Sequence, residues 1–262
     1  MKVVILCGGK GTRLQEATEG VIPKPMVEIG GHPILWHIMK LYAHFHVREF
    51  VLCLGHMGKI IKDFFLHYEV LNSDVTIQMG TPGEISYHRS HQDMDWKVTL
   101  ADTGLETMTG ARLARVRDYV GDTTFMLTYG DGVANIDIPC LLAFHRSHGK
   151  IATITGVEPI SRFGRLTVKD RRVVAFEEKP IGDGGNRING GFFVFEPEVF
   201  DYVSPDPSCT LEREPLERLS ADGQLMMFDH HGFWACMDTY RDLLYLQKLW
   251  DEGNPPWRLW CD

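Results

Sequence analysis

The sequence predicts an α/β protein with a Rossmann-like, mostly parallel mixed sheet that is flanked by helices, and with a smaller mixed-sheet insertion. Three observations indicate this fold. Apolar runs of β-preferring residues alternate with segments of helical period through the first half of the chain. Glycine-rich turns follow two of these runs. The second half contains shorter strand-like runs separated by glycine and charged turns, which is typical of an added small sheet.

The first half is expected to form βαβ units. Its apolar runs have the length of buried strands, and the segments between them place apolar residues on one helical stripe, as Ile34, Ile38 and Leu41 do. Strands that alternate with helices form a mostly parallel sheet, which binds ligands at the carboxyl ends of its strands. The expected strands cover 3–7, 49–55, 73–79, 96–102 and 124–132 (the last ending in a turn), and the expected helices cover 32–45, 59–68 and 110–120.

The second half is expected to add a small sheet and two helices. A chain of 262 residues, 44% hydrophobic and 24% charged, suits one large domain. We expect a single domain over 1–262, with one half at about 1–135, a second at about 136–240, and a C-terminal helix and tail at 241–262. The expected strands cover 151–157, 164–170, 172–180 and 190–200, and the expected helices cover 211–223 and 238–253.

Charge and composition exclude several classes of protein. The formal net charge of −8 argues against binding nucleic acid through a basic surface. No apolar run approaches the roughly 18 residues of a membrane span, and the N-terminus shows no signal-peptide pattern. The six cysteines are scattered without a Cys-x-x-Cys pair. We therefore expect a cytoplasmic protein that binds small molecules rather than nucleic acid or membranes.

The loop after the first strand has the composition of an anion site. It reads Gly8-Gly9-Lys10-Gly11-Thr12-Arg13 and lacks the spacing of a P-loop, and Leu14 stands where a dinucleotide fingerprint needs its third glycine. Glycines allow successive N–H groups to point at one anion, and the guanidinium of Arg13 suits phosphate oxygens. The alternative for this segment alone is a tight turn with a solvated arginine.

Three further residues could face the same ligand. Lys24 lies between two prolines, which predicts a stiff, extended segment that presents a fixed positive charge. Asp131 is flanked by glycines at the end of a strand, and one or two carboxylates are the usual protein ligands of Mg²⁺. Asp238 precedes the last helix and could be its N-cap as well as a metal ligand. Each residue alone also fits an ordinary surface, turn or cap position.

A second group lies later in the chain. Glu178 and Lys179 fall in a Glu-Glu-Lys-Pro string, and Asn189 begins Asn-Gly-Gly-Phe-Phe. A carboxylate, an ammonium and an amide together suit a sugar phosphate, although the first string alone is also an ordinary charged turn. The twelve histidines show no zinc spacing, and no Gly-x-Ser-x-Gly elbow occurs.

Taken in order, these strings resemble the sugar-1-phosphate nucleotidyltransferases, also called nucleotide-sugar pyrophosphorylases. The ordered strings are GGKGTRL, PKPMVEIGG, YGDG, EEKP and NGGFF, and they span nearly the whole chain. Longer strings such as VTLADTGLETMTGARL and FWACMDTYRD are most similar to the branch that uses CTP and glucose 1-phosphate. Ile22 stands where the family often has a lysine, which leaves Lys24 as the lysine of this segment.

The resemblance implies a role for each matching residue. The second half would bind the sugar, and a homo-oligomer such as a hexamer is implied. Arg13, Lys24 and Asp131 would be catalytic, with Arg13 on the departing pyrophosphate and Lys24 on the attacked phosphate. Asp131 and Asp238 would bind Mg²⁺. The nucleotide would contact Leu6, Gly8, Gly9, Gly11, Thr12, Arg13, Thr107, Arg112 and Gly130, and glucose 1-phosphate would contact Glu178, Lys179 and Asn189.

Three other functions remain open on the sequence. A uridylyl- or thymidylyltransferase would share the fold and differ only in the base that it selects. A non-catalytic nucleotide-sugar-binding regulatory subunit would be expected to lose Arg13, Lys24 or the two aspartates, and all of these are present. A Rossmann oxidoreductase that uses NAD is disfavoured by Leu14.

Overall fold

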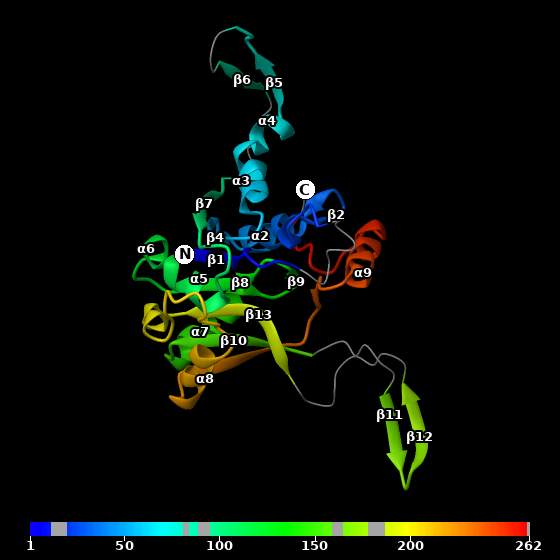
Figure 1. Ribbon diagram of the computed structural model, residues 1–262. Coiled ribbons are helices and arrows are strands. Elements are labelled where there is room, and N and C mark those ends of the chain that lie inside the picture. Colours follow the sequence, from blue (N-terminus) through cyan, green and yellow to red (C-terminus); the bar gives the residue numbers. More distant parts are fainter. Residues whose placement is uncertain (12–19, 81–83, 89–94, 159–164, 178–186, 261–262) are drawn as a thin grey trace.

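The computed structural model describes residues 1–11, 20–80, 84–88, 95–158, 165–177 and 187–260 (Figure 1). Within these residues, seven strands form one sheet in the order β14-β10-β13-β8-β1-β4-β7. Six of the seven are mutually parallel, whereas β13 runs antiparallel to both of its neighbours. The strands are β1 (Lys2–Leu6), β4 (Glu49–Leu54), β7 (Lys97–Asp102), β8 (Phe125–Tyr129), β10 (Ala152–Val157), β13 (Ile188–Phe195) and β14 (Leu225–His230).

Successive side chains of the central strands enter two separate hydrophobic cores, because side chains alternate between the faces of a sheet. Val3 and Ile5 lie in one core, and Val4 and Leu6 lie in the other. Strands buried on both faces need apolar residues at every position, which explains the continuous apolar runs in the sequence. The helices in contact with the first core are α2 (Ile34–His44), α3 (Gly58–Leu66), α7 (Ile138–His148) and α9 (Tyr240–Asp251), and those in contact with the second are α5 (Thr109–Arg115), α6 (Arg117–Val120) and α8 (Glu214–Ala221).

The strands of the second half divide between two places. β10 and β13 join the central sheet instead of forming a separate small sheet, and β14, which the sequence did not indicate, becomes its edge. β11 (Arg165–Lys169) and β12 (Arg172–Glu177) form a separate antiparallel hairpin. Ala152 of β10 and residues 192–195 of β13 are buried in the two cores, and pairing within the large sheet places them there.

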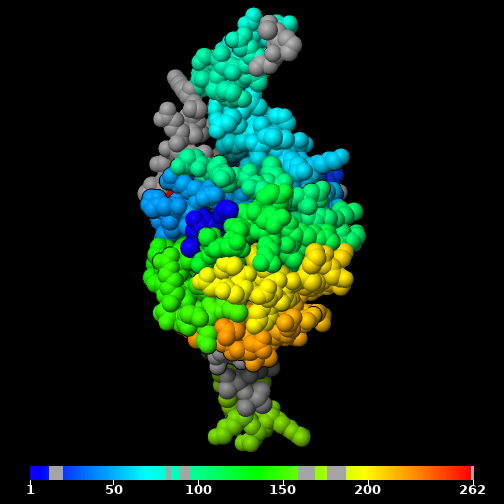
Figure 2. Space-filling model, turned by 90° about the vertical axis from the view of Figure 1, so that its left-hand side faces the viewer, coloured from blue at the N-terminus to red at the C-terminus, as the bar shows by residue number. Residues whose placement is uncertain are grey.

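Two hairpins project from opposite ends of the body (Figures 1 and 2). One consists of β5 (Asp74–Ile77) and β6 (Ile85–His88), which follow the short helix α4 (Tyr68–Asn72). The other is the β11–β12 hairpin. Figure 2 shows the compact body between them. None of the described helices is long and apolar enough to cross a membrane.

Short elements complete the edge of the sheet at which the parallel strands end. A 3₁₀ turn, η2 (Lys24–Met26), is followed by the small pair β2 (Glu28–Ile29) and β3 (His32–Pro33). A second 3₁₀ turn, η3 (Pro197–Asp201), follows the end of β13 and therefore lies at the opposite edge, beside the start of β8. β9 (Gly132–Ala134) pairs antiparallel with β15 (Trp234–Cys236). Because β13 is antiparallel, its first residues lie at the same edge as the last residues of β8.

Candidate active site

A cavity of about 350 Å³ opens at the carboxyl ends of β1 and β8. Its described lining contains ten of the residues that the sequence analysis selected, and five that it did not. This is the place at which a parallel α/β sheet presents its loops to a ligand. The selected residues are Leu6, Gly8, Gly9, Gly11, Lys24, Thr107, Arg112, Gly130, Asp131 and Asp238, and the others are Cys7, Pro25, Met108, Thr109 and Tyr129.

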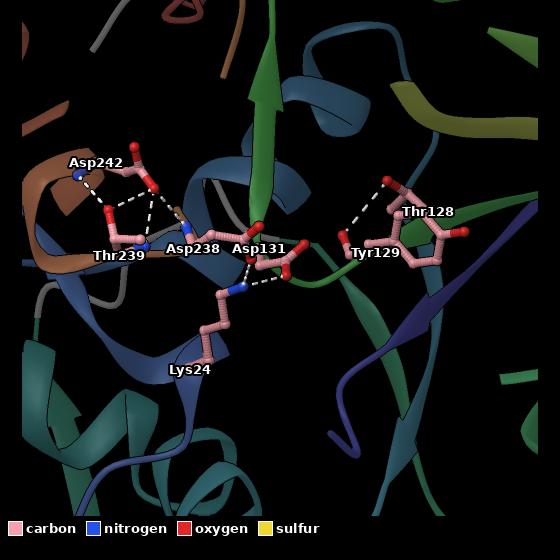
Figure 3. A network of polar contacts seen from close by, with 7 residues as sticks. All are labelled: Lys24, Thr128, Tyr129, Asp131, Asp238, Thr239 and Asp242. Carbon is pink, nitrogen blue, oxygen red and sulfur yellow. Dashed lines mark hydrogen bonds and ion pairs between the residues drawn. The ribbon is translucent and has the colours of Figure 1, made fainter. Parts of the chain in front are cut away.

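Lys24 lies between the two selected aspartates (Figure 3). Its Nζ atom is 2.6 Å from Oδ2 of Asp131 and 2.6 Å from Oδ1 of Asp238. Burial opposes the charge of the ammonium, but attraction to Asp131 and hydrogen bonds to both carboxylates outweigh it and raise the pKa of Lys24. The amine therefore remains protonated and neutralises part of the charge of the carboxylate pair.

Backbone pairing brings the two aspartates together from positions 107 residues apart in the sequence. Asp131 lies in the turn between β8 and β9, and Asp238 follows β15. Cys236 pairs with Gly132 in the ladder, and the amide of Met237 donates a 2.9 Å hydrogen bond to the carbonyl of Asp131. The β9–β15 pair thus fixes both carboxylates at one side of the cavity.

The N-cap of the last helix is Thr239 and not Asp238. The Thr239 hydroxyl accepts a hydrogen bond from the amide of Asp242, and the Asp242 carboxylate accepts one from the amide of Thr239, which completes a capping box. The Asp242 carboxylate also accepts from the amide of Asp238 at 3.1 Å. This cap leaves the side chain of Asp238 directed at Lys24 (Figure 3).

The segment around Lys24 differs from the expected extended chain. Pro23 is extended, with φ −69° and ψ 144°, but Lys24 starts the 3₁₀ turn η2. The turn is held by a 2.8 Å hydrogen bond from the amide of Met26 to the carbonyl of Pro23, and Pro25 and Met26 are buried. The lysine is fixed as the sequence predicted, although by a buried turn and not by an extended strand.

The residues around the carboxylates fit a hard divalent cation. One ligand atom each from Asp131, Asp238 and Cys236 lies within 4.8 Å of the others. Carboxylate oxygens are preferred ligands of Mg²⁺. Burial and the nearby Asp131 raise the pKa of Cys236. A thiol is also a softer ligand than a carboxylate, so the two aspartates are the better ligands for a hard cation. A cation already lies between the two carboxylates, in the form of the Lys24 ammonium.

Arg112 lines the cavity with a guanidinium that is bonded to the protein. Its Nη1 atom donates to the carbonyls of Leu54 and Gly104 at 2.9 Å each, and its Nη2 atom donates to the carbonyl of Gly8 at 3.0 Å. The residue is 4% exposed, and burial lowers the pKa of Arg112. These hydrogen bonds hold the loops after β1, β4 and β7 together. Direct contact of Arg112 with a nucleotide remains a prediction.

Gly8 and Gly9, in the loop after β1, have different surroundings. A Cβ on Gly8 would lie 2.1 Å from Nη1 of Arg112, so this position must lack a side chain for the guanidinium to fit. A Cβ on Gly9 would meet nothing within 4 Å, and Gly9 lines the cavity. The sequence alone assigned both glycines to an anion, whereas the structure gives Gly8 a packing role as well.

Thr107 and Asn189 have well-defined partners. Thr107 is 7% exposed, and its hydroxyl accepts a 3.0 Å hydrogen bond from Nη1 of Arg115. The side-chain amide of Asn189 donates to the hydroxyl of Tyr129 at 3.1 Å. Asn189 thus lies beside the cavity wall and contacts a lining residue. Thr12, Arg13, Glu178 and Lys179 lie outside the described residues.

Five lining residues were not selected in the sequence analysis, because nothing in the local sequence set them apart from core or turn residues. Met108 and Thr109 are contained in the string VTLADTGLETMTGARL that carries part of the resemblance, and Tyr129 directly precedes Gly130. Proximity to a selected residue at a strand end was the available signal. The buried Cys7, which follows β1, has a pKa raised by burial, so its thiol is not a nucleophile in this state.

Comparisons with known proteins identify the family of this chain. The family model described as "Nucleotidyl transferase" matches residues 2–249. A glucose-1-phosphate cytidylyltransferase of Salmonella typhimurium is 51% identical over 261 residues, which cover 99% of this chain and 100% of that protein. A mannose-1-phosphate guanyltransferase of Neurospora crassa is 32% identical. The alignment covers 97% of this chain and 66% of that protein.

The solved structures share the fold. A UDP-glucose pyrophosphorylase complexed with UDP-glucose aligns with a TM-score of 0.67 over 96% of this chain and 98% of that chain. Its sequence identity is 12%, so this similarity concerns the architecture alone.

Proposed function

This chain belongs to the nucleotidyl transferase family, and we propose that it is a glucose-1-phosphate cytidylyltransferase. The reaction joins CTP and α-D-glucose 1-phosphate to give CDP-glucose and diphosphate. The observation that carries the proposal is the convergence of Lys24, Asp131 and Asp238 on one cavity at the ends of β1 and β8. The choice of CTP is supported by 51% identity over the full length to a protein of that activity, against 32% to a guanyltransferase.

The chemistry needs positive charge and alignment more than a base. The attacking oxygen belongs to a phosphate monoester, whose second pKa is about 6, so it is already ionised at neutral pH. It attacks the α-phosphorus of CTP in line with the departing diphosphate. Two anions must approach each other, and fixed cations lower the free energy of that encounter.

The resemblance supports a part in this reaction for most of the selected residues. Asp131 and Asp238 would hold Mg²⁺, which when bound supplies positive charge between the reacting phosphates. Lys24 would place its ammonium on the attacked phosphate, and Arg13 would bind the departing diphosphate. The loop of Gly8, Gly9, Gly11 and Thr12 would surround the triphosphate, while Glu178, Lys179 and Asn189 would bind glucose 1-phosphate.

Measuring diphosphate release tests the proposal. The purified chain is incubated with glucose 1-phosphate, Mg²⁺ and, in separate reactions, CTP, UTP, dTTP, ATP or GTP. We expect kcat/KM for CTP to exceed that for every other nucleotide by at least about tenfold, because the site must offer an acceptor to the amino group of cytosine. A preference for UTP or dTTP would replace the base assignment, and no release with any nucleotide would reject the activity.

We also propose a cytoplasmic homo-oligomer such as a hexamer. The resemblance supports the assembly, and the described cysteines, which are all free, agree with a reducing compartment.

A further inference from the structure

One carboxylate joins two walls of the cavity. Glu212 lies in the loop between η3 and α8. Its Oε1 atom accepts a 2.5 Å hydrogen bond from the hydroxyl of Tyr129, and its Oε2 atom accepts a 2.6 Å hydrogen bond from the hydroxyl of Thr109. Tyr129 and Thr109 both line the cavity but belong to different elements, at the end of β8 and the start of α5. Glu212 therefore fixes the separation of two lining side chains.

The Tyr129 wall continues to Asn189. The side-chain amide of Asn189 donates to the Tyr129 hydroxyl at 3.1 Å, and its oxygen accepts from the amide of Gly191 at 2.8 Å. Gly191 has φ +78°, and a Cβ there would lie 2.5 Å from the Tyr129 ring. The ring also packs edge-on against Phe193, with centroids 5.9 Å apart. These contacts restrict the Tyr129 ring to one orientation. They also connect it to Asn189, which is proposed to bind glucose 1-phosphate.

The Thr109 wall continues into the helix that carries Arg112. The Thr109 hydroxyl accepts a 2.9 Å hydrogen bond from the amide of Leu211. Two backbone hydrogen bonds join the same segments, from Met108 to Pro207 at 2.9 Å and from Ala111 to Cys209 at 3.0 Å. Residues 207–212 thus form one support for the start of α5. Arg112, one turn further along α5, holds the loop at Gly8 that is proposed to bind the nucleotide.

We propose that Glu212 is a positioning residue that couples the sugar-phosphate side of the site to the nucleotide side, with one carboxylate oxygen for each side. It acts through Tyr129 and Asn189 on one side and through Thr109 and α5 on the other. A hydrogen bond to a charged acceptor is stronger than one between neutral groups, which suits a support that must hold two hydroxyls at once. The inference rests on the proposed function, because that function places glucose 1-phosphate at Asn189.

The Tyr129 hydroxyl remains a donor in this arrangement. Burial and then the adjacent Glu212 carboxylate raise the pKa of Tyr129, so the phenol keeps the proton that it donates. The phenol oxygen can then accept the hydrogen bond from Asn189 at the same time as it donates to Glu212.

Three single variants separate the two sides. Tyr129→Phe removes the hydroxyl toward Asn189 and is expected to raise the KM for glucose 1-phosphate about tenfold, with the KM for CTP changed by less than about twofold. Thr109→Val is expected to raise the KM for CTP about tenfold and to change the KM for glucose 1-phosphate by less than about twofold. Glu212→Ala is expected to raise both KM values. Glu214→Ala is the matched control, because Glu214 is an exposed glutamate on the adjoining helix whose only described ion pair is with Arg218 at 3.5 Å.

A double variant tests whether Glu212 acts through Tyr129. If it does, Glu212→Ala with Tyr129→Phe has the same KM for glucose 1-phosphate as Glu212→Ala alone, because the second substitution removes a group that is already unsupported. If the double variant raises the KM for glucose 1-phosphate by the product of the two single effects, the proposal is overturned. KM values of Glu212→Ala that match those of Glu214→Ala, or a lower melting temperature with both KM values unchanged, would overturn it as well.

Two further measurements make the result decisive. If Glu212→Ala does not fold, Glu212→Gln keeps the size of the side chain but has one acceptor oxygen, and it is expected to raise one KM more than the other. Equal KM values for Glu212→Gln and the wild type would overturn the proposal. The wild-type protein is assayed in parallel: no CDP-glucose from it rejects the proposed function, whereas an active wild type with unaffected variants rejects the role of Glu212 alone.

Discussion

Lys24 occupies the position between two carboxylates that a divalent cation would also need. Its ammonium is 2.6 Å from each of Asp131 and Asp238, and its side chain is 13% exposed. A cation that enters must compete with this ammonium, and the released lysine would then be available to a phosphate. Competition between a fixed and a bound cation is expected wherever one carboxylate pair serves both.

Removing the lysine charge should therefore affect cation binding and turnover in opposite directions. Lys24→Met is expected to bind Mn²⁺, used as a probe for Mg²⁺, several-fold more tightly in the absence of nucleotide, and to lower kcat by about a hundredfold or more. Calorimetry and steady-state kinetics measure the two effects. Lys248→Met is the control, because Lys248 is an exposed lysine with only a 3.7 Å ion pair described. Weaker Mn²⁺ binding by Lys24→Met would contradict the competition.

Asp131 gives the complementary prediction. Asp131→Asn removes one carboxylate charge while keeping the shape of the side chain, so the fold should survive and kcat should fall by about a hundredfold or more. Circular dichroism and the release of diphosphate check the two statements. Turnover within about twofold of the wild type would show that Asp131 holds neither the cation nor Lys24 in a catalytically important position.

His37 connects the stability of the fold to pH. It is fully buried, its Nε2 atom lies 2.8 Å from the carbonyl of Ile29, and burial lowers the pKa of His37 to about 4. The unfolded chain takes up a proton near pH 6.5, whereas the folded chain takes it up only near pH 4. The contribution of the neutral, buried His37 to the unfolding free energy is therefore complete above about pH 6.5, and it is lost as the pH falls toward 4.

His37→Gln should reduce this acid sensitivity. Each pKa unit corresponds to about 1.4 kcal/mol, so the full transition amounts to about 3 kcal/mol of unfolding free energy, of which about half should be visible between pH 7 and pH 5. Urea unfolding at both pH values measures the difference between the wild type and the variant. His44→Gln, at an exposed histidine on the same helix, should retain the wild-type difference. The same pH dependence in both variants would exclude His37 as its source.

At the scale of the elements, the position of Asp238 depends on the cap of α9. Thr239 and Asp242 form the capping box, and the Asp242 carboxylate also holds the amide of Asp238 at 3.1 Å. A helix end and a proposed metal ligand thus share one hydrogen-bonded turn. Sequence reasoning placed Asp238 at the start of this helix correctly, but it could not distinguish Asp238 from Thr239 as the cap because both types are good N-caps.

Thr239→Ala is expected to lower the unfolding free energy by about 1 kcal/mol, since an alanine cannot accept the hydrogen bond from Asp242. It should also weaken Mn²⁺ binding, because the turn that directs Asp238 loses its support. Thr239→Ser keeps the hydroxyl and should restore both properties. If Thr239→Ala unfolds earlier but binds Mn²⁺ as well as Thr239→Ser does, the cap has no influence on Asp238.

At the scale of the whole molecule, the hairpin of β5 and β6 carries apolar side chains on a projection from the body (Figures 1 and 2). Exposed apolar groups of this kind mark protein interfaces. The body can bury its own apolar residues in two cores, whereas a two-stranded projection cannot. The exposed large apolar residues are Ile77, Met79, Ile85 and Tyr87 in the hairpin, and Leu66 and Leu71 in the helices α3 and α4 that precede it.

We expect this hairpin to contact a second copy of the chain. Ile77→Asp with Ile85→Asp should lower the molar mass measured by light scattering, because two charges in an apolar interface are costly. Leu244→Asp is the control, since Leu244 is similarly exposed but lies on the helix α9 of the body. An unchanged mass in the double variant, or a monomeric wild type, would remove the hairpin from any interface.

The alternation of apolar runs and helical segments predicted the sheet because strands with both faces buried must be apolar throughout. The strings around Gly8 and Asp131 predicted one site because parallel strands place their final loops at one edge, and the family resemblance added Lys24 and Asp238. Asn189 reached that edge for a different reason, the antiparallel direction of β13, which a sequence of short strands does not reveal.

By itself, the sequence determined the class of fold and predicted the charged residues that the proposed chemistry needs. Local patterns of polarity, glycine and proline act within a few residues, so they can be read along the chain. The tertiary structure alone decided that β10 and β13 join the central sheet. It also decided that Arg112 donates hydrogen bonds to loop carbonyls and that Glu212 connects Tyr129 with Thr109. Those outcomes depend on backbone pairing and packing between distant segments, for which no local pattern exists.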